Sequence, residues 1–138
     1  DDIFGDEDAV CVMEFEAAAQ FKLIIDALNN AKVDPNKVII DHVEEHTAGM
    51  VLDQGFWAGM TLYPESKCTL PRAVDILENF GMENIWMNSA CDWGISDPLA
   101  VAKCMQEMKR RQHSRKTIHQ VVYDNPVKFL SQSPNFSL

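Results

Sequence analysis

The sequence predicts an α/β protein built on a parallel sheet, and two observations support this class. Short apolar runs rich in β-branched residues occur near positions 10, 38, 57 and 84. A longer segment with apolar residues at helical spacing follows most of these runs. Strands that alternate with helices form parallel sheets with right-handed crossovers. Four such units fit either a small open sheet or one half of an eight-stranded barrel, and periodicity does not separate the two.

The first half of the chain contains two of the predicted strands, at residues 9–15 and 37–42. Residues 16–30 between them are predicted to form a helix, because three alanines and a repeating apolar pattern favour helical structure. The Asp-Pro-Asn sequence at 34–36 supplies turn chemistry after this helix. The strand at 37–42 is apolar on both faces, which is typical of a strand buried in a parallel sheet.

The middle of the chain contains a short predicted helix at 47–54, which Gly55 ends. The third predicted strand covers residues 56–63 and stops at Pro64, because proline cannot donate to a strand ladder. Residues 70–80 carry apolar residues at helical spacing and are predicted to form the next helix.

The last third contains the fourth predicted strand, at residues 85–90, and the fourth helix, at 98–111. Two short closing helices are expected at 117–123 and 126–130. Asn125 followed by proline is the reason for separating them, since Asn is a good cap and proline a good first-turn residue.

Length and composition predict one domain, because 138 residues are enough to bury a real core. Residues 1–8 are acidic and hold few apolar side chains, so we interpret them as a tail or a trimmed loop. Residues 9–138 form the single expected domain. The chain begins at Asp1 without an initiating methionine, so we expect it to be a fragment of a longer protein.

The formal net charge of -9 argues against nucleic acid or an anionic membrane as a partner. The basic stretch at 109–116 follows a predicted helix and is interpreted as a solvated helix end. No apolar run approaches the roughly 20 residues of a membrane span, and the acidic start does not resemble a secretory signal. The four cysteines lack paired spacing, so we expect reduced thiols in the cytoplasm or an organellar stroma, not a secreted protein.

Two residues at strand ends are the leading functional candidates. Asp92 lies in an acidic turn after the strand at 85–90, which is where α/β enzymes place catalytic groups. The alternative is that Asp92 and Asp97 only shape the turn and cap the helix. His42 ends the second strand, roughly 10 Å from Asp92 if one strand separates theirs, so both could share Zn²⁺. Asp92 would then also activate a metal-bound water, whereas a His42 bonded only to backbone would do no chemistry.

Two further patterns bear on metal binding. Glu14 at the end of the first strand would enter the same rim as a further ligand, although acids near helix starts are common for dipole reasons alone. Residues 42–46, His-Val-Glu-Glu-His, also match the H-x-x-E-H motif of a zincin-like metallopeptidase. That motif needs 42–46 to be helical, whereas the Val-Ile-Ile run at 38–40 favours a strand.

Four segments of the chain carry a resemblance to a known family. They cover residues 38–45, 55–64, 88–99 and 125–129, and the most specific piece is Asp-Trp-Gly-Ile-Ser-Asp-Pro-Leu at 92–99. Together they resemble the TatD-related metal-dependent hydrolases of the amidohydrolase superfamily, in particular the subgroup encoded in the Ebo operon of bacteria and algae. The resemblance runs from about residue 21 to residue 138.

The resemblance implies a (β/α)₈ TIM barrel with a divalent metal centre, zinc or manganese, that hydrolyses an ester, amide or phosphodiester bond. This chain would supply only strands five to eight, the C-terminal half. The histidine that ends the family's sixth strand and the aspartate that ends its eighth fall on His42 and Asp92. These would bind the metal, and Asp92 would also shuttle protons. Glu14 lies near the place of the family's histidine on the fifth strand.

Half a barrel exposes two strand edges and part of an apolar interior, so we expect a partner. The partner would be a second copy of the chain or a missing N-terminal half of the barrel. The competing hypothesis is a non-enzymatic remnant that serves as a subunit or scaffold.

Overall fold

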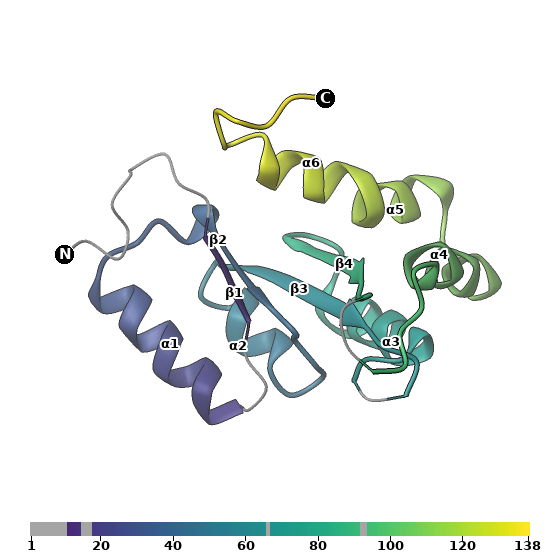
Figure 1. The fold of residues 1–138 in the computed structure, drawn as a ribbon, viewed down its shortest axis with the longest axis horizontal. Coiled ribbons are helices and arrows are strands. Elements are labelled where there is room, and N and C mark those ends of the chain that lie inside the picture. Colours follow the sequence, from purple (N-terminus) through teal and green to yellow (C-terminus); the bar gives the residue numbers. More distant parts are fainter. Residues whose placement is uncertain (1–10, 15–17, 66, 92–93) are drawn as a thin grey trace.

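The computed structural model describes residues 11–14, 18–65, 67–91 and 94–138. Figure 1 shows an α/β fold in which strands form one sheet beside a layer of helices. The strands are β1 (Cys11–Glu14), β2 (Val38–Asp41), β3 (Trp57–Leu62) and β4 (Ile85–Ser89). They lie in the order β1-β2-β3-β4, and each pairs in parallel with the next. The α/β class with a parallel sheet, which was predicted from the alternating patterns, is confirmed.

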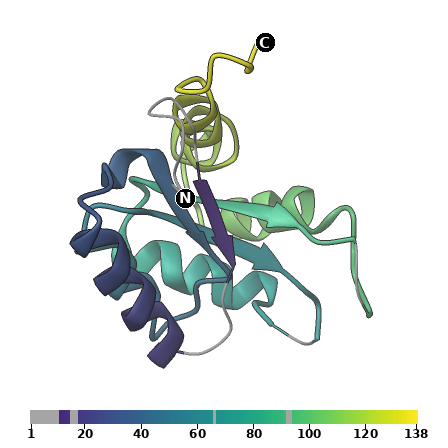
Figure 2. The same cartoon turned by 60° about the vertical axis from the view of Figure 1, so that its left-hand side comes forward.

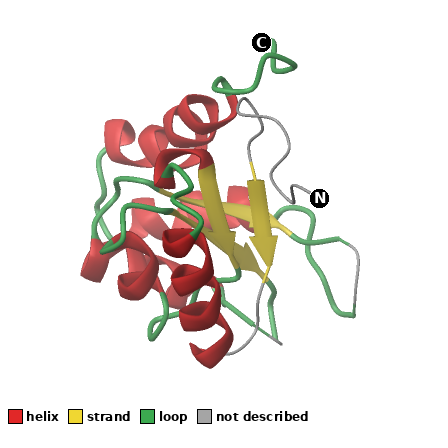
Figure 3. Cartoon of the chain, turned by 90° about the vertical axis from the view of Figure 1, so that its left-hand side faces the viewer, coloured by secondary structure: helices red, strands yellow, loops and turns green. Residues whose placement is uncertain are grey.

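Helices cover one face of the sheet, as Figure 3 shows. They are α1 (Ala18–Asn30), α2 (Ala48–Leu52), α3 (Leu70–Phe80) and α4 (Ala100–Arg110). The last helices, α5 (Arg115–His119) and α6 (Asn125–Leu130), lie across the amino ends of the strands, as Figure 2 shows. Within the described ranges, no helix is long and apolar enough to cross a bilayer.

The closing helices predicted at 117–123 and 126–130 are one continuous helical run instead. A π-helical turn, Gln120–Asp124, joins α5 to α6, and the N–H of Asn125 bonds to the carbonyl five residues earlier. Pro126 lacks an N–H, and its ring crowds the preceding turn of an ordinary helix. The wider π turn accommodates the proline, so the chain continues where a cap was expected.

The main hydrophobic core lies between the sheet and the helices that cover it. Alternate strand residues point into this core, because successive side chains of a strand face opposite sides. These residues are Val38, Ile40, Ala58, Met60, Leu62, Ile85 and Met87. They meet buried helix residues such as Phe21, Leu28 and Ile76. This packing fixes the strands against α1 to α4, and the opposite face of the sheet points away from these helices.

The opposite sheet face changes character along the strands. Its amino end is apolar and consists of Ile39, Trp57 and Trp86, packed against Phe129 of α6. The Phe129 ring lies 5.5 Å from that of Trp57 and 5.1 Å from that of Trp86, measured between centroids. Strand alternation brings Asp41, Thr61 and Asn88 to the carboxyl end of the same face. We call this surface the inner face.

Candidate functional site

Three neighbouring strands bring a polar pocket to the carboxyl rim of the sheet. The pocket has a volume of about 290 Å³ and lies where parallel α/β proteins hold their ligands. Asp41 is the last residue of β2, and His42 follows it directly. The residues that line the pocket are Asp41, His42, Thr61, Tyr63, Asn88, Ser89, Ala90 and Cys91.

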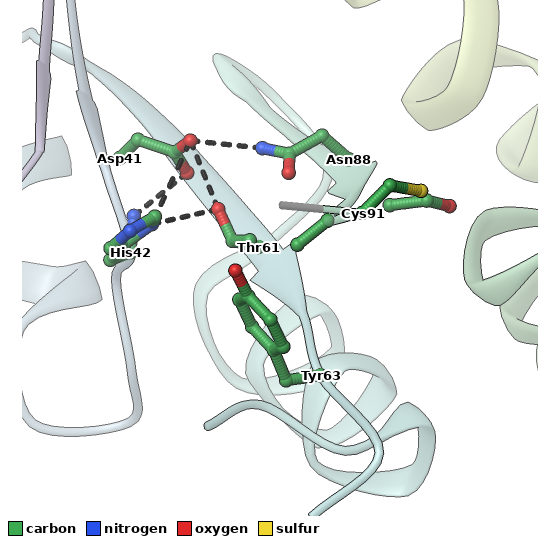
Figure 4. Close-up of a pocket in the computed structure, with 8 residues that line it drawn as sticks. Asp41, His42, Thr61, Tyr63, Asn88 and Cys91 are labelled. Atoms are coloured by element: carbon green, nitrogen blue, oxygen red, sulfur yellow. Dashed lines mark hydrogen bonds and ion pairs between the residues drawn. The ribbon is translucent and has the colours of Figure 1, made fainter. Parts of the chain in front are cut away.

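The Asp41 carboxylate is the centre of the hydrogen bonds in this pocket, as Figure 4 shows. Its Oδ1 accepts the backbone N–H of His42 at 2.7 Å. Its Oδ2 accepts the Thr61 hydroxyl at 3.0 Å and the Asn88 amide at 2.9 Å. Burial alone would raise the pKa of Asp41, but the hydrogen bonds and charge of His42 and the bond from Thr61 outweigh burial and lower this pKa. Asp41 is therefore a fixed, ionised acceptor.

His42 is held beside this carboxylate by its backbone and by β3. Its φ is +66°, in the left-handed region that residues other than glycine seldom adopt. Its Nδ1 lies 2.7 Å from Oγ1 of Thr61 and 3.8 Å from Oδ2 of Asp41. Such backbone conformations cost on the order of 1–3 kcal/mol and cluster at functional sites. The turn at His42 thus presents an oriented imidazole to the pocket.

Gly59 makes room for the Asp41 carboxylate on the inner face. A Cβ placed on Gly59 would lie 2.5 Å from Oδ1 of Asp41 and 3.2 Å from its Cα. Real Cβ atoms do not approach an oxygen so closely, and the carboxylate is held on three sides. Only glycine at this position therefore allows Asp41 its observed place.

The other two predicted site residues are Asp92 and Glu14. Asp92 lies outside the described residues, so its role as catalytic group and metal ligand stays a prediction. Glu14 is the last residue of β1, and its Cα pairs with that of Asp41 in the parallel register. The backbone of Glu14 is therefore at the same rim. Its side chain lies outside the described residues, and its role as a ligand also stays a prediction.

The zincin-like hypothesis is wrong, because residues 42–46 do not form a helix. β2 extends to Asp41, the chain turns after it, and α2 begins only at Ala48. Glu45, which would have to act as the base, instead forms an ion pair of 2.6 Å with Arg72. The β-branched run before His42 favoured a strand, and β2 indeed extends to Asp41, the residue directly before His42.

Three cysteines, Cys68, Cys91 and Cys104, are free thiols with different surroundings. Cys68 and Cys104 are buried, and burial raises the pKa of each thiol to about 12. Both are therefore unreactive packing residues. Cys91 lines the pocket but is exposed, and in Figure 4 its sulfur points away from the Asp41 carboxylate. Cys91 is thus a rim residue of the pocket whose thiol faces away from the Asp41 carboxylate.

His42 was predicted as a site residue from the sequence, whereas the residues that orient it were not. Asp41, Thr61 and Asn88 were not among the candidates, although each is a polar strand residue that directly follows an apolar one. That signal could have found them, because a buried polar side chain in a sheet needs a partner. Their convergence depends on the pairing of β2, β3 and β4, which the sequence alone does not fix.

The imidazole of His42 is a suitable ligand for a divalent metal at this rim. The Asp41 carboxylate, in contrast, is already engaged by three donors of the chain itself. Within the described part of the chain, no three His, Cys, Asp or Glu residues are grouped closely enough to hold a metal ion. The described residues alone therefore do not fit a complete metal centre.

The fold and the rim pocket together define an α/β protein with a parallel sheet, and a comparison with solved structures finds a similar fold. The chain is similar to a β-aspartyl dipeptidase from Fervidobacterium islandicum AW-1, determined in complex with a β-Asp-Leu dipeptide, at a TM-score of 0.69. The two are 9% identical, and the match covers 88% of this chain and 38% of that chain. At this identity the likeness concerns the fold alone. No protein-family model and no curated protein sequence matches the chain.

Proposed function

We propose that the chain is the C-terminal half of a barrel-type hydrolase whose reactive centre lies around His42. The observation that carries this proposal is the buried Asp41–Thr61–Asn88 network, which orients a backbone-strained histidine at the carboxyl rim of a parallel sheet. Rims of this kind hold the active sites of barrel enzymes. The likeness to a dipeptidase fold supports the same reaction class.

The bond to be cleaved is an amide, ester or phosphodiester, as the resemblance to TatD-related hydrolases implies. In its neutral form, the His42 imidazole can accept a proton from an attacking water or bind a divalent cation. Zinc or manganese is part of this proposal. We further propose that Asp92 and Glu14 contribute to the same centre, with Asp92 as metal ligand and proton shuttle.

The remaining part of the centre would come from a partner. The chain spans 38% of the length of the dipeptidase it resembles. Within the described residues the sheet ends at β1 and β4, and each end strand has an edge open to a partner. We propose a second copy of the chain, or an N-terminal half of the barrel, as the partner that closes the sheet. We also propose a reducing compartment, cytoplasm or organellar stroma, as the location.

Metal content tests the proposal, measured together with the mass of the assembly in solution. The purified chain is freed of loosely bound metal, and zinc and manganese are then determined for the parent, His42→Ala, Asp92→Asn and His46→Ala. His46 is exposed and stands outside the pocket, so it serves as the matched control. We expect stoichiometric metal in the parent and in His46→Ala, and loss of metal in the other two. A His42→Ala variant that keeps its metal, or a parent that assembles as two copies and still binds no metal, would contradict the proposal.

A second candidate function is a non-enzymatic subunit or scaffold derived from such a barrel. The saturated Asp41 carboxylate favours it, because a carboxylate with three internal donors can serve stability alone. Under this alternative the chain still assembles with a partner, but it binds no metal and hydrolyses no amide, ester or phosphodiester. The same metal and mass measurement separates the two functions.

A further inference from the structure

The hydrogen bonds around Thr61 restrict where the protons in the pocket lie. A carboxylate offers only acceptors, and each Asp41 oxygen already receives an N–H, from the His42 backbone on Oδ1 and from Asn88 on Oδ2. The Thr61 hydroxyl also lies 3.0 Å from Oδ2. Because an ionised carboxylate cannot donate, the single proton of that hydroxyl must point to Asp41.

The same hydroxyl oxygen contacts the imidazole of His42. Oγ1 of Thr61 lies 2.7 Å from Nδ1 of His42, a hydrogen-bond distance. Since the hydroxyl proton is committed to Asp41, Oγ1 can only accept in this contact. The proton of the bond must therefore sit on Nδ1.

We infer that Thr61 is a positioning residue that holds His42 in the tautomer with its proton on Nδ1 and its lone pair on Nε2. Figure 4 shows the carboxylate, the hydroxyl and the ring in mutual contact. Asn88 and the His42 backbone keep Asp41 in place, Asp41 orders the Thr61 hydroxyl, and Thr61 orders the ring. The catalytic use of this order rests on the proposed function, whereas the tautomer itself does not.

The consequence concerns which ring atom does chemistry. With the proton on Nδ1, the atom that accepts a proton from water or binds a divalent cation is Nε2. A residue that orients an imidazole through its other nitrogen fixes both the tautomer and the direction of the ligand atom. Thr61 therefore acts on the reaction through His42 and not by touching a substrate.

The test is the tautomer of His42 in the metal-free chain of residues 1–138. Histidine is labelled with ¹⁵N, and both ring nitrogens are observed by NMR at about pH 8.5, where an unperturbed imidazole is neutral. We expect a protonated Nδ1 and an unprotonated Nε2 for His42 in the parent. A proton on Nε2 in the parent would overturn the inference without the need for any variant.

Two substitutions separate ordering from mere packing. Thr61→Val keeps the side-chain shape and removes the hydroxyl, so we expect the single Nδ1–H form to be lost to a mixture. Thr61→Ser returns the hydroxyl and should restore the single form. A Thr61→Val variant whose tautomer is unchanged would overturn the role of Thr61, and His46 in the same spectra should not respond. The tautomer is measured without metal, so the two proposals can fail separately. If His42 has its proton on Nδ1 but the chain binds no metal, only the proposed function is contradicted. If the chain binds metal at His42 but the metal-free ring has its proton on Nε2, only this inference is contradicted.

Discussion

The two ends of the inner face are built from the same strands but differ in character: the amino end is apolar and packed, and the carboxyl end is polar and hydrogen-bonded. At the amino end, Trp57 and Trp86 pack on Phe129 of α6, and Trp57 is 2% exposed. At the carboxyl end, strand positions on the same side carry Thr61 and Asn88, and both donate a hydrogen bond to Asp41. Packing at one end therefore stabilises the fold, and directed hydrogen bonds at the other end orient the His42 imidazole. Barrel enzymes divide stability and chemistry between the ends of their strands in the same way.

The largest effect should come from the amino end. Phe129→Ala removes a fully buried ring from the aromatic cluster, so we expect a loss of about 3–5 kcal/mol in the free energy of unfolding. Denaturant titration measures this loss. Leu130→Ala, at a partly exposed neighbour on the same helix, is the control and should cost far less. Equal losses in the two variants would mean that the cluster does not stabilise the fold.

The middle of the inner face should respond to a single methyl group. Gly59→Ala forces a Cβ against the Asp41 carboxylate, and we expect overpacking to cost about 1–3 kcal/mol and to displace Asp41. Thermal or denaturant unfolding and the tautomer of His42 report the two consequences. Gly49→Ala in α2 is the control: its Cβ would meet the ring of Phe80, which is 40% exposed and free to move. An unaffected Gly59→Ala variant would place the Asp41 carboxylate elsewhere.

A smaller effect is expected when one donor leaves the carboxyl end. Asn88→Ala removes the amide that bonds to Oδ2 of Asp41 at 2.9 Å, and hydrogen bonds to charged groups contribute about 1.5–3 kcal/mol. Part of this loss is offset if water enters the pocket beside Asp41. We therefore expect a cost of about 1–2 kcal/mol in unfolding free energy. No loss at all would show that Asn88 does not hold Asp41.

The smallest effect concerns a charged group outside both ends of the inner face. Hydrogen bonds from Arg110 and then Arg111 lower the pKa of Glu107 from 4.5 to about 2. Because the folded pKa is depressed, this carboxylate adds stability above about pH 4.5 and loses it as the pH falls toward 2. Glu107→Gln should flatten that part of the pH profile of denaturant midpoints. The tautomer of His42 should be unchanged in this variant. A changed tautomer would mean that Glu107 on α4 is coupled to the rim pocket.

Much of the fold followed from sequence pattern, because parallel strands leave a local signature. The runs at 38–40 and 85–87 are apolar on both faces, and helical segments with clear apolar spacing separate the strands. The closing helix differed from prediction at Pro126, where a π turn replaced the expected cap. That outcome depends on packing against β4, because the side-chain amide of Asn125 donates a hydrogen bond to the backbone carbonyl of Ile85 in that strand. A local cap rule does not include such a contact.

The candidate site was less predictable than the fold. His42 was found because a polar residue after an apolar strand stands out in any α/β sequence. Thr61 was missed because the Met60-Thr61-Leu62 stretch shows only one hydroxyl in an apolar run. Its importance comes from its place across the sheet from Asp41, a contact between residues 20 positions apart. Such contacts need strand register, which local patterns do not contain.

The most direct test of a reactive centre around His42 is a zinc titration of the ¹⁵N-histidine-labelled chain. The chain has four histidines, and each reports separately in one set of spectra. We expect zinc to shift the Nε2 resonance of His42 at stoichiometric amounts and to leave His46, His113 and His119 in place. A His42 that does not respond, or a response first at His46 or another surface histidine, would contradict the centre proposed at this rim.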